Sequence, residues 1–147
     1  MNKKTETIVI PERHHALLAR CHQAMLSTIR HVDGLISTNP VGYVCEESRI
    51  RISTIKERMK YKNLLVNPLV SFCVISPDDV MEYLEIRGYA TLEDDEDRSF
   101  SRKQFIRSAG VEPPEDLDPP GTERVIITIH PQQISSPKLY GGRFNKK

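Results

Sequence analysis

Hydrophobic and polar positions alternate with a period of two in several segments of the chain. In segment 49–54, Ile50 and Ile52 alternate with cationic or hydroxyl-bearing side chains, which predicts a strand with one apolar face and one polar face. Segment 81–92 repeats this pattern. Segment 69–75 is almost continuously apolar, as expected for a strand that is buried on both faces.

Turn residues separate further strands from one another. An Asp-Gly pair at 33–34 predicts a hairpin between strands at 24–30 and 35–44, because this turn requires positive φ. Pro40 predicts a bulge or an exposed edge in the second of these strands. With a last strand at 124–129, the sequence predicts a mainly β fold of six antiparallel strands with short helices, arranged as a small barrel.

Three short segments have helical patterns. Pro11 suits the first turn of a helix, so we expect a short helix in the N-terminal region 1–22. A second helix is expected at 57–66 and a third at 97–108. The acidic run 93–97 complements the dipole of the third helix, and we interpret it as structural rather than as a metal site.

We expect a single domain that comprises residues 1–147, because this length is typical of one domain. A loop rich in proline and acidic residues is expected at 111–122, where it would run over the surface. A proline-containing tail is expected at 136–147.

Composition narrows the function classes. The formal net charge is +1, so a global basic field for nucleic acid or an anionic membrane is absent, whereas cations concentrate at 49–62 and favour a small anionic ligand. The sequence contains neither an apolar run long enough to span a bilayer nor a secretory signal, which predicts a cytoplasmic protein. The odd number and wide spacing of Cys21, Cys45 and Cys73 predict reduced thiols.

A candidate phosphate site lies where the strand 49–54 meets the helix 57–66. Ser53 and Thr54 precede Arg58 and Lys60. Hydroxyls and free backbone N–H groups at a helix start suit phosphate oxygens, and nearby cations strengthen such hydrogen bonds. The alternative is a solvated basic helix, a common feature of ordinary domains.

Other chemistry has little support in the sequence. The five histidines have no metal-ligand spacing, and the chain has no nucleophile elbow or Walker loop. Gly141-Gly142 follows no predicted strand, which excludes a dinucleotide fingerprint. We therefore predict no metal ligands and assign no catalytic acid, base or nucleophile.

Several motifs occur in an order and spacing typical of one family. They are Asn39-Pro40-Val41, the strand end Ile52-Ser53-Thr54, the segment Arg58-x-Lys60-x-x-Asn63-Leu64 and the segment Arg87-Gly88-x-Ala90. Together they resemble the pyridoxamine 5′-phosphate oxidase-like, FMN-binding split-barrel superfamily. The short chain and the Arg-x-Lys-x-x-Asn-Leu form are similar to the branch that uses the deazaflavin coenzyme F420.

The resemblance implies a split β-barrel of Greek-key type and a homodimer with two cofactor sites at the subunit interface. It implies that the phosphate-bearing tail and cofactor edge lie against the strand end and the helix start, and that the second strand approaches the ring. The cofactor-binding residues expected on this basis are Asn39, Pro40, Val41, Ser53, Thr54, Arg58, Met59, Lys60 and Asn63.

The function implied is an oxidoreductase that transfers a hydride between coenzyme F420 and a small conjugated organic acceptor, with the chemistry supplied by the cofactor. FMN with the same fold is the alternative cofactor, and a non-enzymatic flavin- or tetrapyrrole-binding protein is a third reading. Ile36 and the loop 111–120 depart from the family pattern, and we expect contacts with the acceptor there.

Overall fold

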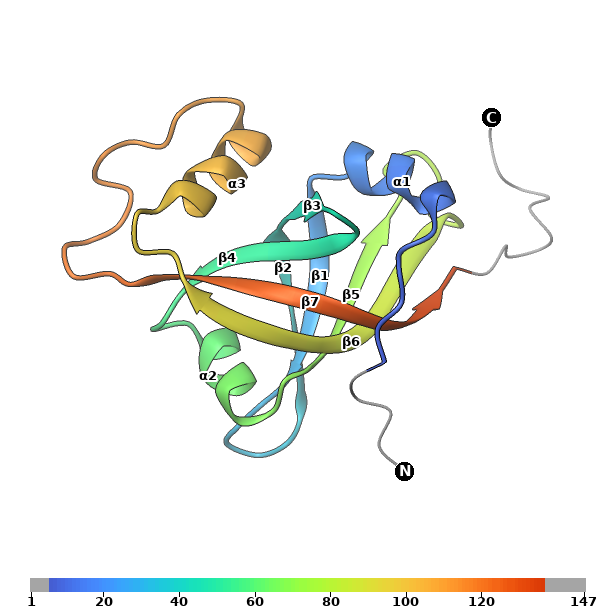
Figure 1. The fold of residues 1–147 in the computed structure, drawn as a ribbon, viewed down its shortest axis with the longest axis horizontal. Coiled ribbons are helices and arrows are strands. Elements are labelled where there is room, and N and C mark those ends of the chain that lie inside the picture. Colours follow the sequence, from blue (N-terminus) through green and yellow to red (C-terminus); the bar gives the residue numbers. More distant parts are fainter. Residues whose placement is uncertain (1–5, 137–147) are drawn as a thin grey trace.

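Seven antiparallel strands form one curled sheet in the computed structural model, which describes residues 6–136 (Figure 1). The strands are β1 (Gln23–Ile29), β2 (Ile36–Gly42), β3 (Val44–Glu46), β4 (Arg49–Ile55), β5 (Leu69–Ile75), β6 (Tyr83–Asp94) and β7 (Arg124–Ser135). Their order in the sheet is β2-β1-β5-β6-β7-β4-β3. The predicted mainly β, antiparallel split-barrel fold is confirmed.

The seventh strand arises because the expected strand 35–44 is two strands. β2 ends at Gly42 and β3 begins at Val44, and these two strands form opposite edges of the described sheet. One residue, Tyr43, therefore joins the two edges, so the sheet must curl until they meet. The Tyr43 side chain is fully buried, and its hydroxyl oxygen lies within hydrogen-bond distance of the carbonyl oxygens of Leu18 (2.7 Å) and Cys21 (2.8 Å).

The hairpin predicted at the Asp-Gly pair joins β1 to β2. Gly34 adopts a φ of 75°, and Asp33 accepts a hydrogen bond from the Arg30 side chain at 2.9 Å. Pro40 lies exposed in the edge strand β2, opposite Met25. Because β2 is an edge strand, the sheet does not lose a hydrogen bond through the N–H that proline lacks. Both predictions from turn chemistry are confirmed.

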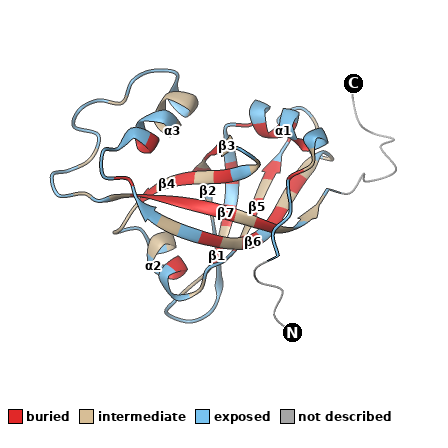
Figure 2. Ribbon diagram, viewed as in Figure 1, coloured by how far each residue is buried: buried red, intermediate tan, exposed pale blue. Residues whose placement is uncertain are grey.

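The core fills the concave side of the curled sheet. The alternation of β4 places Ile50 and Ile52 inside, as predicted, and Phe72 of β5 and Leu84 of β6 belong to the same core. Figure 2 shows this alternation of buried and less buried positions along β4 and β6. Full burial of each such side chain stabilises the fold by roughly 1.5–3 kcal/mol.

Burial on both faces occurs in β7 rather than in β5, where it was predicted. β5 buries alternate residues, and its terminal residues Leu69 and Ile75 are 44% and 51% exposed. In β7, residues 125–129 are all buried, because Phe100 of the third helix covers Ile126 on the outer side. The prediction for segment 69–75 is therefore wrong for the single chain.

The last strand continues past its predicted end at residue 129. Pro131 lies opposite Gly88, and a break in register between Arg87 and Gly88 marks a bulge. A Cβ at Gly88 would lie 2.0 Å from the carbonyl oxygen of His130. The bulge and the glycine together admit a proline into a paired strand, which a regular ladder excludes.

The helices begin close to their predicted positions. They are η1 (Glu12–His14), α1 (His15–Arg20), α2 (Met59–Val66) and α3 (Ser99–Ala109). The Asp95 carboxylate accepts hydrogen bonds from the N–H groups of Phe100 (3.3 Å) and Ser101 (2.8 Å), which satisfies donors at the start of α3. This capping is the structural role predicted for the acidic run. Parts of the expected N-terminal region and tail, residues 1–5 and 137–147, lie outside the described residues.

Candidate functional site

The two hydroxyls of the predicted site lie on opposite faces of β4. Thr54 is 5% exposed and points to the side of Ile50 and Ile52, whereas Ser53 lies on the outer face with Arg51. This divergence follows from the period of two in a strand. Ser53 and Thr54 therefore cannot both direct their side chains at one phosphate.

Ser53 is held by two residues that the sequence analysis did not identify. Its N–H donates to Oε1 of Gln104 on α3 at 2.7 Å. The Arg124 guanidinium, at the start of β7, lies 3.4 Å from the Ser53 hydroxyl oxygen. Both partners are more than 50 residues away in the chain, so no local motif could have indicated them.

The cations Arg58 and Lys60 lie at the start of α2 without a carboxylate partner among residues 6–136. Lys60 is half-buried, and its pKa is lowered by burial and, secondarily, by the neighbouring charge of Arg58. By contrast Lys56, just before the helix, pairs with Glu123 (2.6 Å) and Asp94 (3.3 Å). Two adjacent cations without a counter-charge, next to the free first N–H groups of a helix, form a site suited to an anion.

The other helix residues of the predicted site have different roles. Met59 is 45% exposed, beside the two cations. Asn63 is 1% exposed; its Oδ1 accepts hydrogen bonds from the N–H of His31 (3.0 Å), and its Nδ2 donates to Thr28 (3.1 Å). In the single chain Asn63 thus fixes α2 against the end of β1.

The predicted ring-contacting segment lies on the edge strand β2. Val41 is buried in the core, Asn39 is half-buried and Pro40 is exposed. The curl of the sheet brings this strand into contact with β4. Gln104 marks the meeting point, because it binds Ser53 and also lies against Gly42, the residue after Val41.

An ion-pair cluster anchors the acidic loop 111–122 beside this meeting point. The side chain of Asp118 is 8% exposed and accepts hydrogen bonds from Arg124 at 2.6 and 2.8 Å and from Arg98 at 3.1 Å. The hydrogen bond from Arg124 lowers the pKa of Asp118. The loop is therefore tied to the first residue of β7, and through Arg124 it reaches Ser53.

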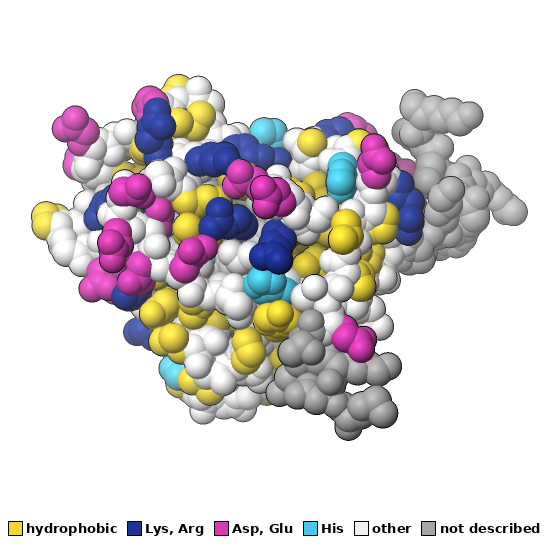
Figure 3. Space-filling model, viewed as in Figure 1, with side chains coloured by type: hydrophobic (Ala, Val, Ile, Leu, Met, Phe, Trp, Pro, Cys, Tyr) yellow, Lys and Arg dark blue, Asp and Glu magenta, His cyan; other side chains and the backbone are white. Residues whose placement is uncertain are grey.

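Cations elsewhere on the outer face of β4, β6 and β7 interleave with acids (Figure 3). Arg51 donates to Glu93 at 2.7 Å and lies near Glu46 at 4.0 Å. Such exposed pairs contribute little to stability, but they neutralise the surface around the junction.

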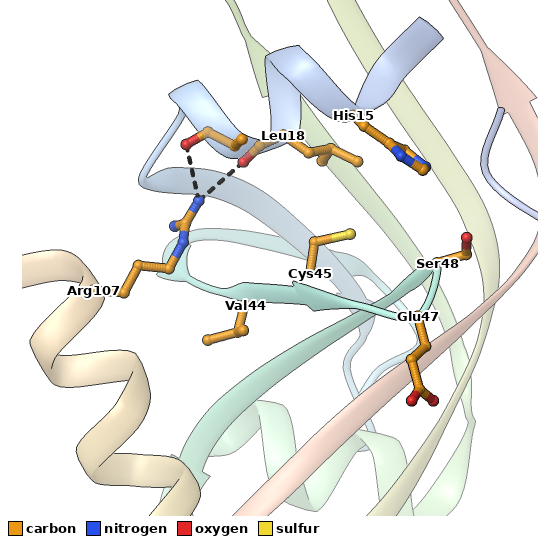
Figure 4. Close-up of a pocket in the computed structure, with 8 residues that line it drawn as sticks. His15, Leu18, Val44, Cys45, Glu47, Ser48 and Arg107 are labelled. Atoms are coloured by element: carbon orange, nitrogen blue, oxygen red, sulfur yellow. Dashed lines mark hydrogen bonds between the residues drawn. The ribbon is translucent and has the colours of Figure 1, made fainter. Parts of the chain in front are cut away.

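A separate pocket of about 360 Å³ lies between α1, the β3–β4 turn and α3 (Figure 4). Arg107 at its side donates to the carbonyls of Leu18 (3.0 Å) and Cys21 (2.9 Å), which caps the end of α1. Burial raises the pKa of the Cys45 thiol, and it raises that of Tyr43 to about 12. These features are typical of structural packing, because a reactive thiol requires a lowered pKa.

Residues 6–136 contain no group of three histidine, cysteine or acidic side chains placed to hold a metal ion. No helix in this part of the chain is long and apolar enough to cross a membrane.

Comparison with known proteins identifies the family. The family model described as pyridoxamine 5′-phosphate oxidase matches residues 10–136. The chain belongs to the pyridoxamine 5′-phosphate oxidase family. A search of curated proteins found no match.

Solved structures of similar proteins agree with this membership of the pyridoxamine 5′-phosphate oxidase family. An F420 reductase is 33% identical, with 86% of this chain and 98% of that chain covered and a TM-score of 0.74. A putative pyridoxamine 5′-phosphate oxidase from Listeria innocua is 22% identical, with coverages of 86% and 97% and a TM-score of 0.67. A related FMN-binding protein from Nostoc punctiforme is 15% identical, with coverages of 90% and 87% and a TM-score of 0.63. The last two show the shared fold alone.

Proposed function

We propose that this protein is an oxidoreductase that uses coenzyme F420 to reduce a small conjugated organic acceptor. Family membership supports the coarser assignment to an oxidoreductase-like protein that binds a flavin or deazaflavin. Arg58 and Lys60 at the start of α2 have no carboxylate partner in the described part of the chain, and this observation carries the proposal, because these cations match the anionic tail of such a cofactor. The 33% identity to an F420 reductase favours the deazaflavin.

Each part of the proposed site has a separate task. Arg58, Lys60 and the first N–H groups of α2 bind the phosphate-bearing tail, with Met59 as an apolar contact beside them. Ser53 and Thr54 form the strand end that lies along the cofactor edge, and the β2 segment 39–41 approaches the ring. Asn63 is a positioning residue, which holds α2 in place through Thr28 and His31. When bound, the cofactor supplies the hydride, and the protein supplies orientation and charge.

A homodimer completes the site in this proposal. The apolar strand β5 leaves its outer side open in the single chain, with Leu69 and Ile75 exposed. A second copy of the chain would cover this side and account for the apolar character of the segment. Each cofactor would then contact residues of both subunits. We propose a cytoplasmic location for this dimer.

FMN is the second candidate cofactor. It carries a single phosphate that the same cations could bind, and the related protein from Nostoc punctiforme is described as FMN-binding. A non-enzymatic carrier of a flavin or tetrapyrrole is the remaining alternative, and it predicts tight binding without turnover.

The deciding experiment is a fluorescence titration of the ligand-free protein with coenzyme F420 and, in parallel, with FMN. We expect saturable binding of coenzyme F420 with a Kd of about 1 μM, and binding of FMN at least about tenfold weaker. The reverse order would assign the protein to the FMN-dependent group. Absence of binding to both would overturn the proposal and leave the cations as part of a solvated helix.

A further inference from the structure

A pocket of about 160 Å³ lies beside the proposed cofactor site, lined by Ser53 of that site and by Gly42, the residue after the segment 39–41. Its walls come from Gly42 at the end of β2, Ser53 on β4, Gln104 and Phe105 on α3, Leu117 in the acidic loop and Arg124 at the start of β7. This volume is below that of pockets for drug-sized ligands, so it suits a small molecule or one end of a larger one.

The charge in this pocket is internally neutralised. Arg124 is its cation, and both of its guanidinium contacts to the loop go to the two oxygens of Asp118, at 2.6 and 2.8 Å. An entering anion would have to displace or lie beside this carboxylate. The pocket therefore favours an uncharged group.

Gln104 presents a hydrogen-bond donor to the pocket. A backbone N–H can only donate, so the oxygen of the carboxamide must face the Ser53 N–H, and the NH₂ group must point the other way. Nε2 has no acceptor among the described residues. It lies 3.4 Å from the position that a Cβ on Gly42 would take.

Gly42 keeps the pocket open. A Cβ at this position would lie 3.0 Å from the hydroxyl oxygen of Ser108 and 3.4 Å from Nε2 of Gln104, closer than most contacts that real Cβ atoms make. Because Gly42 directly follows the segment 39–41, the space that it leaves adjoins the proposed place of the cofactor ring.

We propose that this pocket binds the carbonyl end of an uncharged acceptor, with Gln104 Nε2 donating a hydrogen bond to the carbonyl oxygen. Gln104 is then a specificity-determining residue, held in one orientation by Ser53. Leu117 and Phe105 supply apolar contacts to the carbon skeleton. The role of the ligand as hydride acceptor rests on the proposed function, whereas its binding to this pocket does not require the cofactor.

The test uses 2-cyclohexen-1-one as a neutral probe and cyclohexene-1-carboxylate as an anionic probe of similar ring size. Saturation-transfer NMR on the ligand-free full chain measures their binding. We expect the ketone to bind and the carboxylate to bind at least about tenfold more weakly. In the wild-type protein, the amide signals of Ser53 and the side-chain NH₂ of Gln104 should shift as the ketone is added.

Two variants probe the proposed contact. Gln104→Glu keeps the oxygen that accepts from Ser53 but removes the donor, and Gly42→Ala fills the space. Each variant should weaken ketone binding about tenfold or more, Gln104→Glu because a hydrogen bond is lost and Gly42→Ala because the cavity is filled. Gln133→Glu, the same chemical change at an exposed glutamine that accepts from Arg87, should have no effect.

Titration of the Gln104→Glu variant with coenzyme F420 separates the two proposals. Cofactor affinity within about twofold of wild type, together with weaker ketone binding, supports the pocket as a distinct subsite. Unchanged ketone binding in both variants, tighter binding of the carboxylate, or no shift at Ser53 and Gln104 in the wild-type protein would overturn the inference. The wild-type measurement decides the matter even if a variant does not fold.

Discussion

At the scale of single residues, the pairing of charges distinguishes the candidate site from its surroundings. Lys56 and Arg51 next to the junction have carboxylate partners within 3.3 Å, whereas Arg58 and Lys60 have none among residues 6–136. A half-buried ammonium beside a second cation is unfavourable unless an anion compensates it. Such a local conflict is expected at a binding site.

Replacement of Lys60 by methionine should weaken binding of coenzyme F420 without reducing the stability of the ligand-free protein. The methionine keeps the apolar stem, so what is lost is the charge-assisted hydrogen bond to the cofactor, about 1.5–3 kcal/mol or roughly 10- to 150-fold in Kd. Fluorescence titration measures the Kd, and a thermal melt measures the stability.

Lys62→Met is the matched control, because Lys62 is an exposed lysine on the same helix. It should change neither quantity. A Lys60→Met variant with normal affinity and a lower melting temperature would show that Lys60 supports the fold and not the cofactor.

The sequence alone indicated the cations of the site but not how their neighbours are held. Strand–helix junction chemistry pointed to Ser53, Arg58 and Lys60, since these lie close together in the chain. Gln104 and Arg124 reach Ser53 from distant elements. Their role depends on the curl of the sheet and the docking of α3, which no local pattern contains.

At the scale of elements, two carboxylates attach the loop 111–122 to the rest of the chain: exposed Glu112 pairs with Arg102, and Asp118 is shielded from solvent. Asp118 joins Arg98, the residue before α3, to Arg124 of β7, and its side chain is 8% exposed. Removal of this charge would leave the Arg124 guanidinium, whose side chain is 17% exposed, without its carboxylate partner, which costs free energy. The loop therefore depends on the charge of Asp118.

Asp118→Asn should loosen this loop, with a cost of about 1–3 kcal/mol in the stability of the attached region. Hydrogen exchange, read by mass spectrometry over residues 111–124, should show lost protection in the variant while the core strands stay protected. Asp116→Asn, at an exposed acid of the same loop, should leave exchange unchanged. Equal protection in both variants would mean that contacts other than the Asp118 ion pairs order the loop, among them the Arg102–Glu112 pair.

The attachment of the loop 111–122 through Asp118 should depend on pH. The Arg124 hydrogen bond lowers the pKa of Asp118 below its ordinary value of 3.8. As the pH falls, Asp118 therefore takes up a proton at a higher pH when the loop is detached from Arg124 than when it is bound to Arg124. The stabilisation is thus complete well above pH 3.8, declines as the pH falls below this value, and is lost once the pH passes the lowered pKa. Hydrogen exchange of the loop, measured as a function of pH and corrected for the intrinsic pH dependence of amide exchange, should show this loss of protection in the wild-type protein. The Asp118→Asn variant should not show it.

Element types were largely predictable, and the errors have physical causes. Strand alternation and turn residues placed most strands within a few residues. The break at Tyr43 was missed because the apolar pattern runs on through it, although the chain passes there from one sheet edge to the other. The extension of β7 was missed because Pro131 normally ends a strand, and only the bulge opposite Gly88 admits it.

At the scale of the whole molecule, the open side of the sheet is the part that a single chain does not explain. Met25 at 40%, Leu69 at 44%, Ile75 at 51% and Ile36 at 74% are exposed positions on β1, β5 and β2. The sequence predicted burial of β5 on both faces, and a second copy of the chain would provide it. In the sheet register Met25 lies directly between Pro40 and Cys73, so it sits in the same row as the proposed ring-contacting segment.

If the protein forms the proposed dimer, Met25→Lys should dissociate it and weaken cofactor binding together. A lysine in the middle of this surface would be buried without a partner on association, which costs several kcal/mol. Sedimentation velocity should show a dimer for the wild-type protein and a monomer for the variant, and fluorescence titration should show a parallel loss of affinity. Val80→Lys, at a 76% exposed residue outside the strands, should remain a dimer with normal affinity. A monomeric wild-type protein that still binds one cofactor per chain would place the whole site within a single subunit, and the exposed row on β1, β2 and β5 would then need another explanation.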